Sequence, residues 1–166
     1  EFIKSGLLFN ENISVQTLVN IKSTKKDEIF NEAKLELKVL NGKISFDKSV
    51  FINNNIGLME ISNSDLFLEN DKLFLSSNLS IDIKDIDKLY SFLNTSKNSR
   101  KNIRNIKLNI IYDFLSNQIE LNNIKINDND VSSQFNNIAE GFIDINSNNL
   151  TKSRKLLNEL INLYDG

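Results

Sequence analysis

Hydrophobic and polar residues alternate along most of the first 127 positions, which is the pattern of β-strands with one apolar face. In "KLFLSSNLSIDIKDIDKLYSFLN", the odd-numbered apolar residues of the first half are Leu73, Leu75, Leu79, Ile81 and Ile83. At Asp85 the period of the pattern changes from two to 3.6. The apolar residues that follow are Ile86, Leu89, Tyr90 and Leu93. The stretch therefore predicts a long one-sided strand that leads directly into a short amphipathic helix.

A β-hairpin is predicted within "AKLELKVLNGKISFDKS". Its apolar residues on one side are Leu35, Leu37 and Val39 in the first strand and Ile44 and Phe46 in the return strand. Asn41-Gly42 lies between them, and both residue types tolerate the positive φ angles of a two-residue type I′ turn.

A second hairpin is predicted for residues 103–127. The first strand carries Ile106, Leu108, Ile110, Tyr112 and Phe114 on one face, and the turn is expected at "LSNQ". The return strand begins with Ile119 and Leu121, but the apolar residues then shift to Ile124 and Ile126. One extra residue at Asn122-Asn123, a β-bulge, would produce this shift.

These patterns predict a single α+β domain that is mostly β. The expected elements are a β-meander over 1–84, a helix over 85–95, the hairpin over 103–127 and an amphipathic C-terminal helix over 149–164. Asn149 and Thr151 are alternative N-caps of the last helix. The strands, about seven to nine of them, would form one curled antiparallel sheet whose apolar face needs a cover, and the two helices would supply part of it.

Composition narrows the class of function. The 166 residues carry a net charge of −2, which argues against a nucleic-acid partner. The chain has no Cys, so disulfides and thiolate metal sites are excluded. No apolar run reaches the length of a membrane span, and the chain begins at Glu1 without a signal segment. We therefore expect a fragment of a longer protein, with any anchor upstream.

Candidate chemistry is sparse. The chain has no His, its Gly residues are scattered, and no Ser lies in a nucleophile motif, so neither a catalytic residue nor a cofactor is predicted. Two acidic clusters are formally able to bind calcium or to act as a glycosidase pair: Asp82, Asp85 and Asp87, and Asp128 and Asp130. Helix capping and turn formation explain both clusters better, and no metal site is predicted.

The basic stretch "KNSRKNIRNIK" admits two interpretations. It is either a solvated loop that keeps the sheet soluble or a contact for lipid headgroups or an acidic partner. The headgroup candidates are Arg100, Lys101 and Arg104.

The apolar stripes are the largest feature of the sequence. They are either the core of a closed domain or the wall of an open groove, in which each buried CH₂ of a bound lipid chain contributes about 0.8 kcal/mol. The groove candidates are Leu35, Leu37, Val39, Ile44, Phe46, Leu73, Leu75, Leu79, Ile81, Ile106, Leu108, Ile110 and Phe114.

Residues 30–166 resemble the C-terminal region of the AsmA-like proteins of Gram-negative bacteria, within the bridge-like lipid-transfer group that includes TamB and YhdP. The resemblance lies in "DIDKLYSFL", "SRKNIRNIKLNIIYDF" and the terminal "RKLLNELINL". It implies a non-enzymatic periplasmic domain, attached to the inner membrane through upstream sequence. Its β-taco-like groove would guide phospholipid acyl chains in lipid transport and outer-membrane biogenesis, with an envelope protein as a further partner.

Two other functions stay open. A closed β-domain acting as a protein–protein interaction or assembly module would have a dry core and no large exposed apolar patch. A surface adhesin or stalk would show internal repeats, and the sequence shows none.

Overall fold

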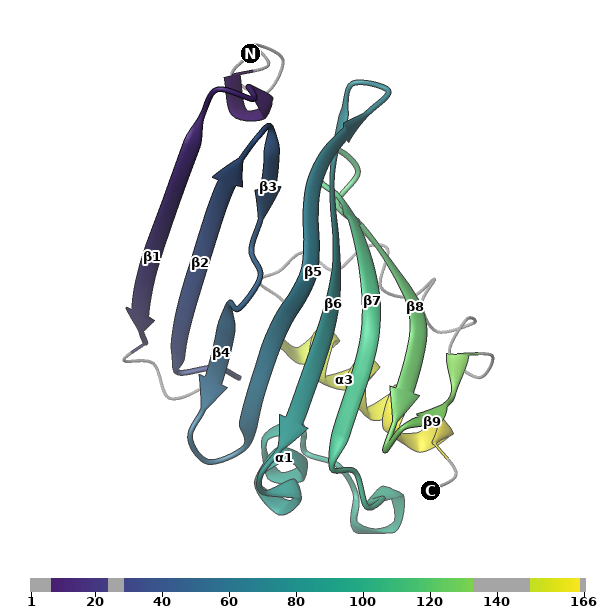
Figure 1. Cartoon of the computed structure of the whole chain (residues 1–166). Helices are drawn as coiled ribbons and strands as arrows, with labels where there is room; N and C mark the ends of the chain where they lie inside the picture. The colour runs from purple at the N-terminus through teal and green to yellow at the C-terminus, as the bar shows by residue number, and fades with distance from the viewer. Residues whose placement is uncertain (1–6, 24–28, 133–149, 165–166) are drawn as a thin grey trace.

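The computed structural model describes residues 7–23, 29–132 and 150–164 and shows a mostly β fold built on one antiparallel sheet of nine strands (Figure 1). The strands are β1 (Ser14–Lys22), β2 (Glu32–Leu40), β3 (Lys43–Ser45), β4 (Val50–Asn53), β5 (Gly57–Glu69), β6 (Lys72–Ile83), β7 (Asn105–Asp113), β8 (Gln118–Ile126) and β9 (Asn129–Asp130). The described helices are η1 (Leu7–Phe9), α1 (Ile86–Leu93), η2 (Lys97–Ser99) and α3 (Leu150–Leu163). The predicted mostly β fold with an antiparallel sheet is confirmed.

Strands β3 and β4 share one position in the sheet, because both pair with β2 and with β5. The chain leaves the ladder at Phe46. In the gap between β3 and β4, two serine hydroxyls accept hydrogen bonds from backbone amides. The Ser64 hydroxyl accepts from the Phe46 amide (2.6 Å), and the Ser49 hydroxyl accepts from the Glu36 amide (3.0 Å). The return strand of the first hairpin therefore stops at Ser45, one residue short of the predicted Phe46.

The turn of the first hairpin has the predicted chemistry. Asn41 and Gly42 have φ angles of 51° and 73°, which are the positive values of a type I′ turn. A Cβ on Gly42 would also lie 2.7 Å from the carbonyl oxygen of Phe9, so the residue following Asn41 has to be glycine.

The second hairpin confirms the predicted bulge and corrects the predicted turn. The β7–β8 register passes from Lys107 opposite Lys125 to Asn109 opposite Asn122, and the intervening Asn123 has a φ of 51°. The turn occupies residues 114–117, one residue earlier than "LSNQ". The strand ends early because the carboxylate of its last residue, Asp113, accepts hydrogen bonds from the backbone amides two and three positions later.

Helix α1 follows β6 directly, as predicted. The Asp85 carboxylate accepts a hydrogen bond from the Lys88 amide (3.0 Å) and caps the helix, and Asn94 ends it in the left-handed conformation. Helix α3 contains Thr151, so the prediction of Thr151 as N-cap is wrong, and residue 149 lies outside the described residues. Residues 133–148, which precede α3, also lie outside the described residues.

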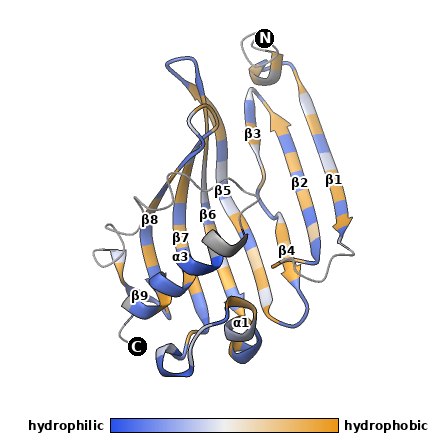
Figure 2. Ribbon diagram, turned by 180° about the vertical axis from the view of Figure 1, so that it is seen from behind, coloured by the Kyte–Doolittle hydropathy of each residue, from blue (hydrophilic) through white to orange (hydrophobic). Residues whose placement is uncertain are grey.

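Helix α3 lies across one face of the sheet near one end of β6 to β8, and α1 lies at that same end, where β6 stops (Figure 2). Asn158 of α3 joins them, because its amide donates to the Leu93 carbonyl at the end of α1 (2.7 Å) and its side-chain oxygen accepts from Thr95. The guanidinium of Arg154 lies 4.4 Å from the ring centroid of Phe92 on α1. The two helices therefore form one cover over this end of the sheet.

Most of the buried hydrophobic residues in the described part of the chain form two separate clusters. The cluster beneath the helices, called here the helix-end cluster, contains Tyr90, Leu93, Ile103, Ile124, Ile126, Val131, Ile161 and Tyr164. The cluster at the opposite end of the sheet, called here the turn-end cluster, contains Val39, Ile44 and Leu66, with Phe9 and Ile13 packed against it. The sheet is thus closed at its two ends by different parts of the chain.

Candidate functional site

The strand register gathers apolar side chains on one face of the sheet. Directly paired residues in an antiparallel ladder share a face. One row of paired residues crosses the sheet through Val15, Val39, Ile44, Leu66, Leu75, Tyr112 and Ile119. A second row, nearer the helices, runs through Ile21, Ala33, Phe51, Met59, Ile81, Ile106 and Ile126. We call the face that holds both rows the apolar face.

Nearly all of the predicted groove residues lie on or beside this face. By register and alternation the face includes Leu35, Leu37, Val39, Ile44, Leu73, Leu75, Leu79, Ile81, Ile106, Leu108 and Ile110. Phe46 packs against the turn-end cluster. Phe114 differs, because it lies in the β7–β8 turn with 44% of its surface exposed, and its ring contacts Tyr112 at 4.8 Å between centroids.

The opposite face of the sheet is mostly polar. Charged residues on it include Lys34, Glu36, Lys38, Glu60 and Lys107, each adjacent in sequence to a residue of the apolar face. Figure 2 shows this as alternating hydrophilic and hydrophobic bands along the strands. The sheet is therefore strongly two-sided, as the alternation predicted.

Among the described residues, the middle of the apolar face belongs to neither buried cluster. Leu35, Ile61, Leu79 and Ile110 lie there, and each stays partly accessible to solvent. Toward the β1 edge, accessibility rises further, because Val15, Val19 and Ile21 are 44–47% exposed. The described helices thus cover one end of the apolar face. At its centre Ser77 is 1% exposed and the apolar side chains are partly accessible, whereas the β1 side is more accessible.

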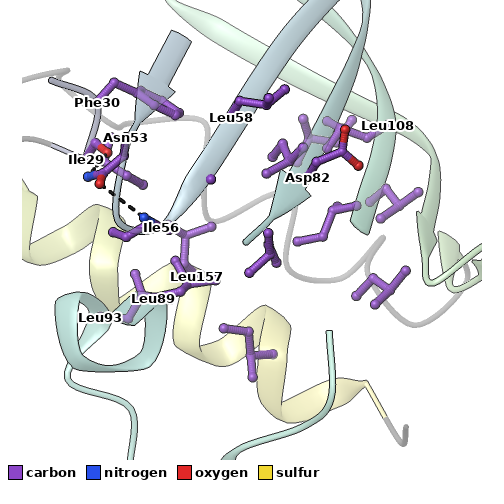
Figure 3. Close-up of a pocket in the computed structure, with 18 residues that line it drawn as sticks. Ile29, Phe30, Asn53, Ile56, Leu58, Asp82, Leu89, Leu93, Leu108 and Leu157 are labelled. Atoms are coloured by element: carbon purple, nitrogen blue, oxygen red, sulfur yellow. Dashed lines mark hydrogen bonds between the residues drawn. The ribbon is translucent and has the colours of Figure 1, made fainter. Parts of the chain in front are cut away.

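A cavity of about 150 Å³ lies where the helices meet the sheet (Figure 3). Its wall combines sheet residues with helix residues: Ile29, Phe30, Asn53, Ile56, Gly57, Leu58, Ile81, Asp82, Ile83, Leu89, Leu93, Ile106, Leu108, Leu121, Ile124, Ile126, Leu157 and Ile161. Predicted groove residues Ile81, Ile106 and Leu108 therefore line it. The cavity extends the apolar face under the helices.

The polar residues of the wall offer a ligand little to bind. The Asn53 side chain is already hydrogen-bonded to the backbone: its amide donates to the Ile29 carbonyl (2.8 Å) and its oxygen accepts from the Asn55 amide (3.0 Å). Asp82 is exposed and pairs with Leu58 and Asn105 on the polar side of the ladder. The cavity is suited to an apolar group.

The predicted basic residues lie beside α1 but have different surroundings. Arg100 lies 3.5 Å from Asp87 and 5.5 Å from the ring centroid of Tyr90, so its charge is directed at α1. The structure gives the side chains of Lys101 and Arg104 no ion pair among the described residues. Of the three, Lys101 and Arg104 are the ones whose charge remains available to an anionic ligand.

Tyr90 fixes the position of the basic loop, which is the segment that carries Arg100, Lys101 and Arg104. Its hydroxyl accepts a hydrogen bond from the Lys101 amide (2.7 Å) and donates to the Lys101 carbonyl. The side chain is only 2% exposed, and this burial raises the pKa of Tyr90 above its usual value. The hydroxyl therefore stays neutral and keeps its donor role at ordinary pH.

The acidic residues have structural partners. Asp85 caps α1, Asp87 faces Arg100, and the Asp128 carboxylate accepts from the Lys107 ammonium (2.8 Å), which lowers the pKa of Asp128. The Asp130 carboxylate accepts from the Ser132 amide (2.9 Å), which lowers the pKa of Asp130. Among the described residues, no group of three or more potential His, Cys, Asp or Glu ligands is close enough to hold a metal ion.

The sequence pattern missed the contribution of β5 to the apolar face. Met59 and Ile61 reach this face from odd positions, whereas Leu66 reaches it from an even one. The reason is the register shift between Ser62 and Asp65, which changes the parity within one continuous strand. A change of parity inside "IGLMEISNSDLFLEN" is the signal that would have identified these residues.

Comparison with protein-family models, curated proteins and solved structures finds no match to this chain. None of the described helices has the length and hydrophobicity that a membrane crossing requires.

Proposed function

We propose that the apolar face is an open groove, that it binds the acyl chains of phospholipids, and that the chain acts without enzymatic activity in lipid transport. The observation that supports this is the pair of apolar rows crossing the sheet, of which the described helices cover only one end. Soluble monomers rarely leave a contiguous apolar surface of this kind exposed unless it binds something.

The dimensions of the face suit a lipid chain. Strand β6 has 12 residues, which at about 3.3 Å per residue gives a length of about 40 Å. One leaflet of a bilayer contributes about half of its 30 Å hydrocarbon core, so an acyl chain spans about 15 Å. A chain can therefore lie along the strands with all of its length in contact with apolar side chains.

The cavity beneath the helices would hold the end of such a chain. An apolar cavity of about 150 Å³ accommodates a benzene-sized group of about six carbon atoms. At about 0.8 kcal/mol per buried CH₂, the same number of methylenes contributes about 5 kcal/mol. Leu89 and Leu157, which line the helix side of the wall together with Leu93 and Ile161, would close over the terminal carbons.

The charged headgroup would stay outside the groove. Lys101 and Arg104 are the proposed headgroup contacts, because their charges have no described ion-pair partner. Arg100 would contribute less, since Asp87 already faces it. The proposal predicts that anionic phospholipids bind more tightly than zwitterionic ones, and that salt reduces the difference.

The wider assignment is part of the same proposal. The resemblance to AsmA-like proteins supports a periplasmic location, an attachment to the inner membrane through upstream sequence, and a role in outer-membrane biogenesis with an envelope protein partner. In that setting the groove would act passively, by keeping acyl chains away from water while they move.

Native mass spectrometry of the chain purified from a Gram-negative host, together with extraction and identification of lipids, tests the proposal. The informative variants are Leu79→Asn and Ile110→Asn, because both residues lie in the middle of the apolar face and outside both clusters. The matched control is Ile111→Asn, which changes the neighbouring residue on the opposite face. We expect phospholipid on the wild type and on the control, and at least tenfold less on the two variants.

A folded wild type free of lipid, or equal lipid on all four proteins, would contradict the proposal. The wild type free of lipid would then favour the interaction module. Strand β1 is the observation that favours that second candidate, because all nine of its residues are exposed.

A further inference from the structure

Strand β1 is an edge strand with an unusually apolar and accessible surface. It pairs with β2 along its whole length, and within the described part of the chain nothing pairs with its other side. Leu18, at the centre of the strand, is 69% exposed. The only charged residue in the strand is Lys22, at its end. Edge strands normally carry charge, proline or a bulge that blocks pairing, and β1 has none of these at its centre.

The phase of the ladder shows which backbone groups face the open side. The Glu36 amide donates to the Ser49 hydroxyl, on the side of β2 away from β1. Glu36 pairs with Leu18, so these two residues form a non-hydrogen-bonded pair. The N–H and C=O groups of Leu18 therefore point to the open edge, as do those of Gln16 and Asn20 at the same phase.

The strand is complementary to a second copy of itself. In an antiparallel pairing centred on Leu18, odd residues face odd residues, so the apolar faces of the two copies lie on the same side of the joined sheet. The facing pairs are Ser14 with Lys22, Val15 with Ile21, Gln16 with Asn20, Thr17 with Val19, and Leu18 with itself. No pair places like charges opposite each other, and on the apolar side of the join Val15 faces Ile21 and Thr17 faces Val19.

We propose that two copies of this chain associate through their β1 edges in this register. The contact is isologous, with the two-fold axis perpendicular to the sheet and midway between the two Leu18 residues. The pairs Ser14–Lys22 and Gln16–Asn20 each occur twice across the two copies, and the Leu18 pair occurs once. Each of these five pairs exchanges two backbone hydrogen bonds, so about ten hydrogen bonds form. The dimer joins the apolar faces of both copies into one surface, and this holds whether or not that surface binds lipid.

Analytical ultracentrifugation of the purified chain tests the proposal. We expect the wild type to sediment as a dimer of 19.0 kDa chains at about 100 μM, a concentration that populates even weak interfaces. Leu18→Lys and Leu18→Glu place like charges at the two-fold axis, so each alone should associate at least tenfold more weakly. A 1:1 mixture of the two variants should recover dimer, because Lys then faces Glu. Leu40→Lys, on β2 and 39% exposed, is the matched control and should leave association unchanged.

Amide hydrogen exchange on the wild type gives an independent measurement that needs no variant. The amides of Gln16, Leu18 and Asn20 should exchange more slowly as the protein concentration rises, whereas the amides of Thr17 and Val19, which face β2, should not depend on it. A monomeric wild type at about 100 μM would overturn the proposal. So would a dimer that both Leu18 variants retain, or a variant mixture that stays monomeric.

Discussion

Replacement of Tyr90 by Phe should destabilise the fold and release the basic loop. The Tyr90 hydroxyl satisfies both backbone groups of Lys101, and the side chain is almost completely buried. Phe fills the same volume and leaves the packing of the helix-end cluster intact. The variant therefore isolates the effect of the hydroxyl.

The magnitude depends on the two backbone groups that lose their partner. An orphaned buried N–H or C=O costs about 1–3 kcal/mol. Lys101 is only partly buried, so water recovers part of this cost at each group. We expect a loss of about 2 kcal/mol in the free energy of unfolding, which corresponds to a shift of roughly 4–8 °C in the melting temperature of a chain of this size.

Urea unfolding followed by circular dichroism measures this loss. Tyr112→Phe is the matched control, because the Tyr112 hydroxyl donates only to the exposed side chain of Asn117 (2.9 Å). We expect the control to lie within about 0.5 kcal/mol of the wild type. A Tyr90→Phe variant as stable as the control would show that the Lys101 backbone does not depend on this hydroxyl, contrary to the prediction.

The same hydroxyl makes stability depend on alkaline pH. Burial raises the pKa of Tyr90 above its usual 10.0, against the lowering effects of the Lys101 backbone hydrogen bond and of Arg100. The folded state therefore retains the proton more strongly than the unfolded state does. The resulting stability is complete below pH 10.0 and is lost as the pH rises through the folded pKa. The stability difference between the wild type and Tyr90→Phe should shrink over that range.

Three other predictions concern the sheet and the helix cover. Gly57→Ala should cost more than about 3 kcal/mol or prevent folding, because the new methyl would lie 2.1 Å from a backbone oxygen of β6; denaturation and solubility report this. Asn158→Ala should cost about 1–3 kcal/mol and raise the hydrogen exchange of α3, since the last carbonyl of α1 loses its donor. An NMR titration should place the pKa of Asp128 below 3.8, chiefly because its carboxylate accepts a hydrogen bond from Lys107. This contact therefore stabilises the folded state above pH 3.8, and the stabilisation is lost as the pH falls through the folded pKa. An unchanged Asp128 pKa in Lys107→Ala would contradict this assignment.

Alternation and turn chemistry were sufficient to predict most of the sheet. The Asn41-Gly42 turn, the bulge at Asn122-Asn123 and the helix start at Asp85 all follow from local rules, because each depends on residues within a few positions. The "LSNQ" turn was displaced by one residue for a local reason as well, the capture of following amides by Asp113.

Features that depend on contacts between distant parts of the chain could not be predicted from local sequence patterns. The sharing of one sheet position by β3 and β4 depends on the Ser49 and Ser64 hydroxyls, which contact residues 13 and 18 positions away. The cavity depends on α3 reaching across the sheet to place Leu157 and Ile161 opposite β6 to β8. The pattern predicted which residues share a face, but the extent to which the helices cover that face is a property of tertiary packing.

The proposed function requires that the apolar face, and not the opposite face, contacts lipid acyl chains. Photocrosslinking distinguishes the two faces. A photoreactive residue replaces either Leu79 on the apolar face or Ile111 on the opposite face, and each protein is irradiated with liposomes that contain an anionic phospholipid. We expect lipid adducts, identified by mass spectrometry, at position 79 and at most a small fraction of that yield at position 111. Equal yields at the two positions, or no lipid adduct at position 79 in a folded protein, would show that the apolar face is not a lipid groove.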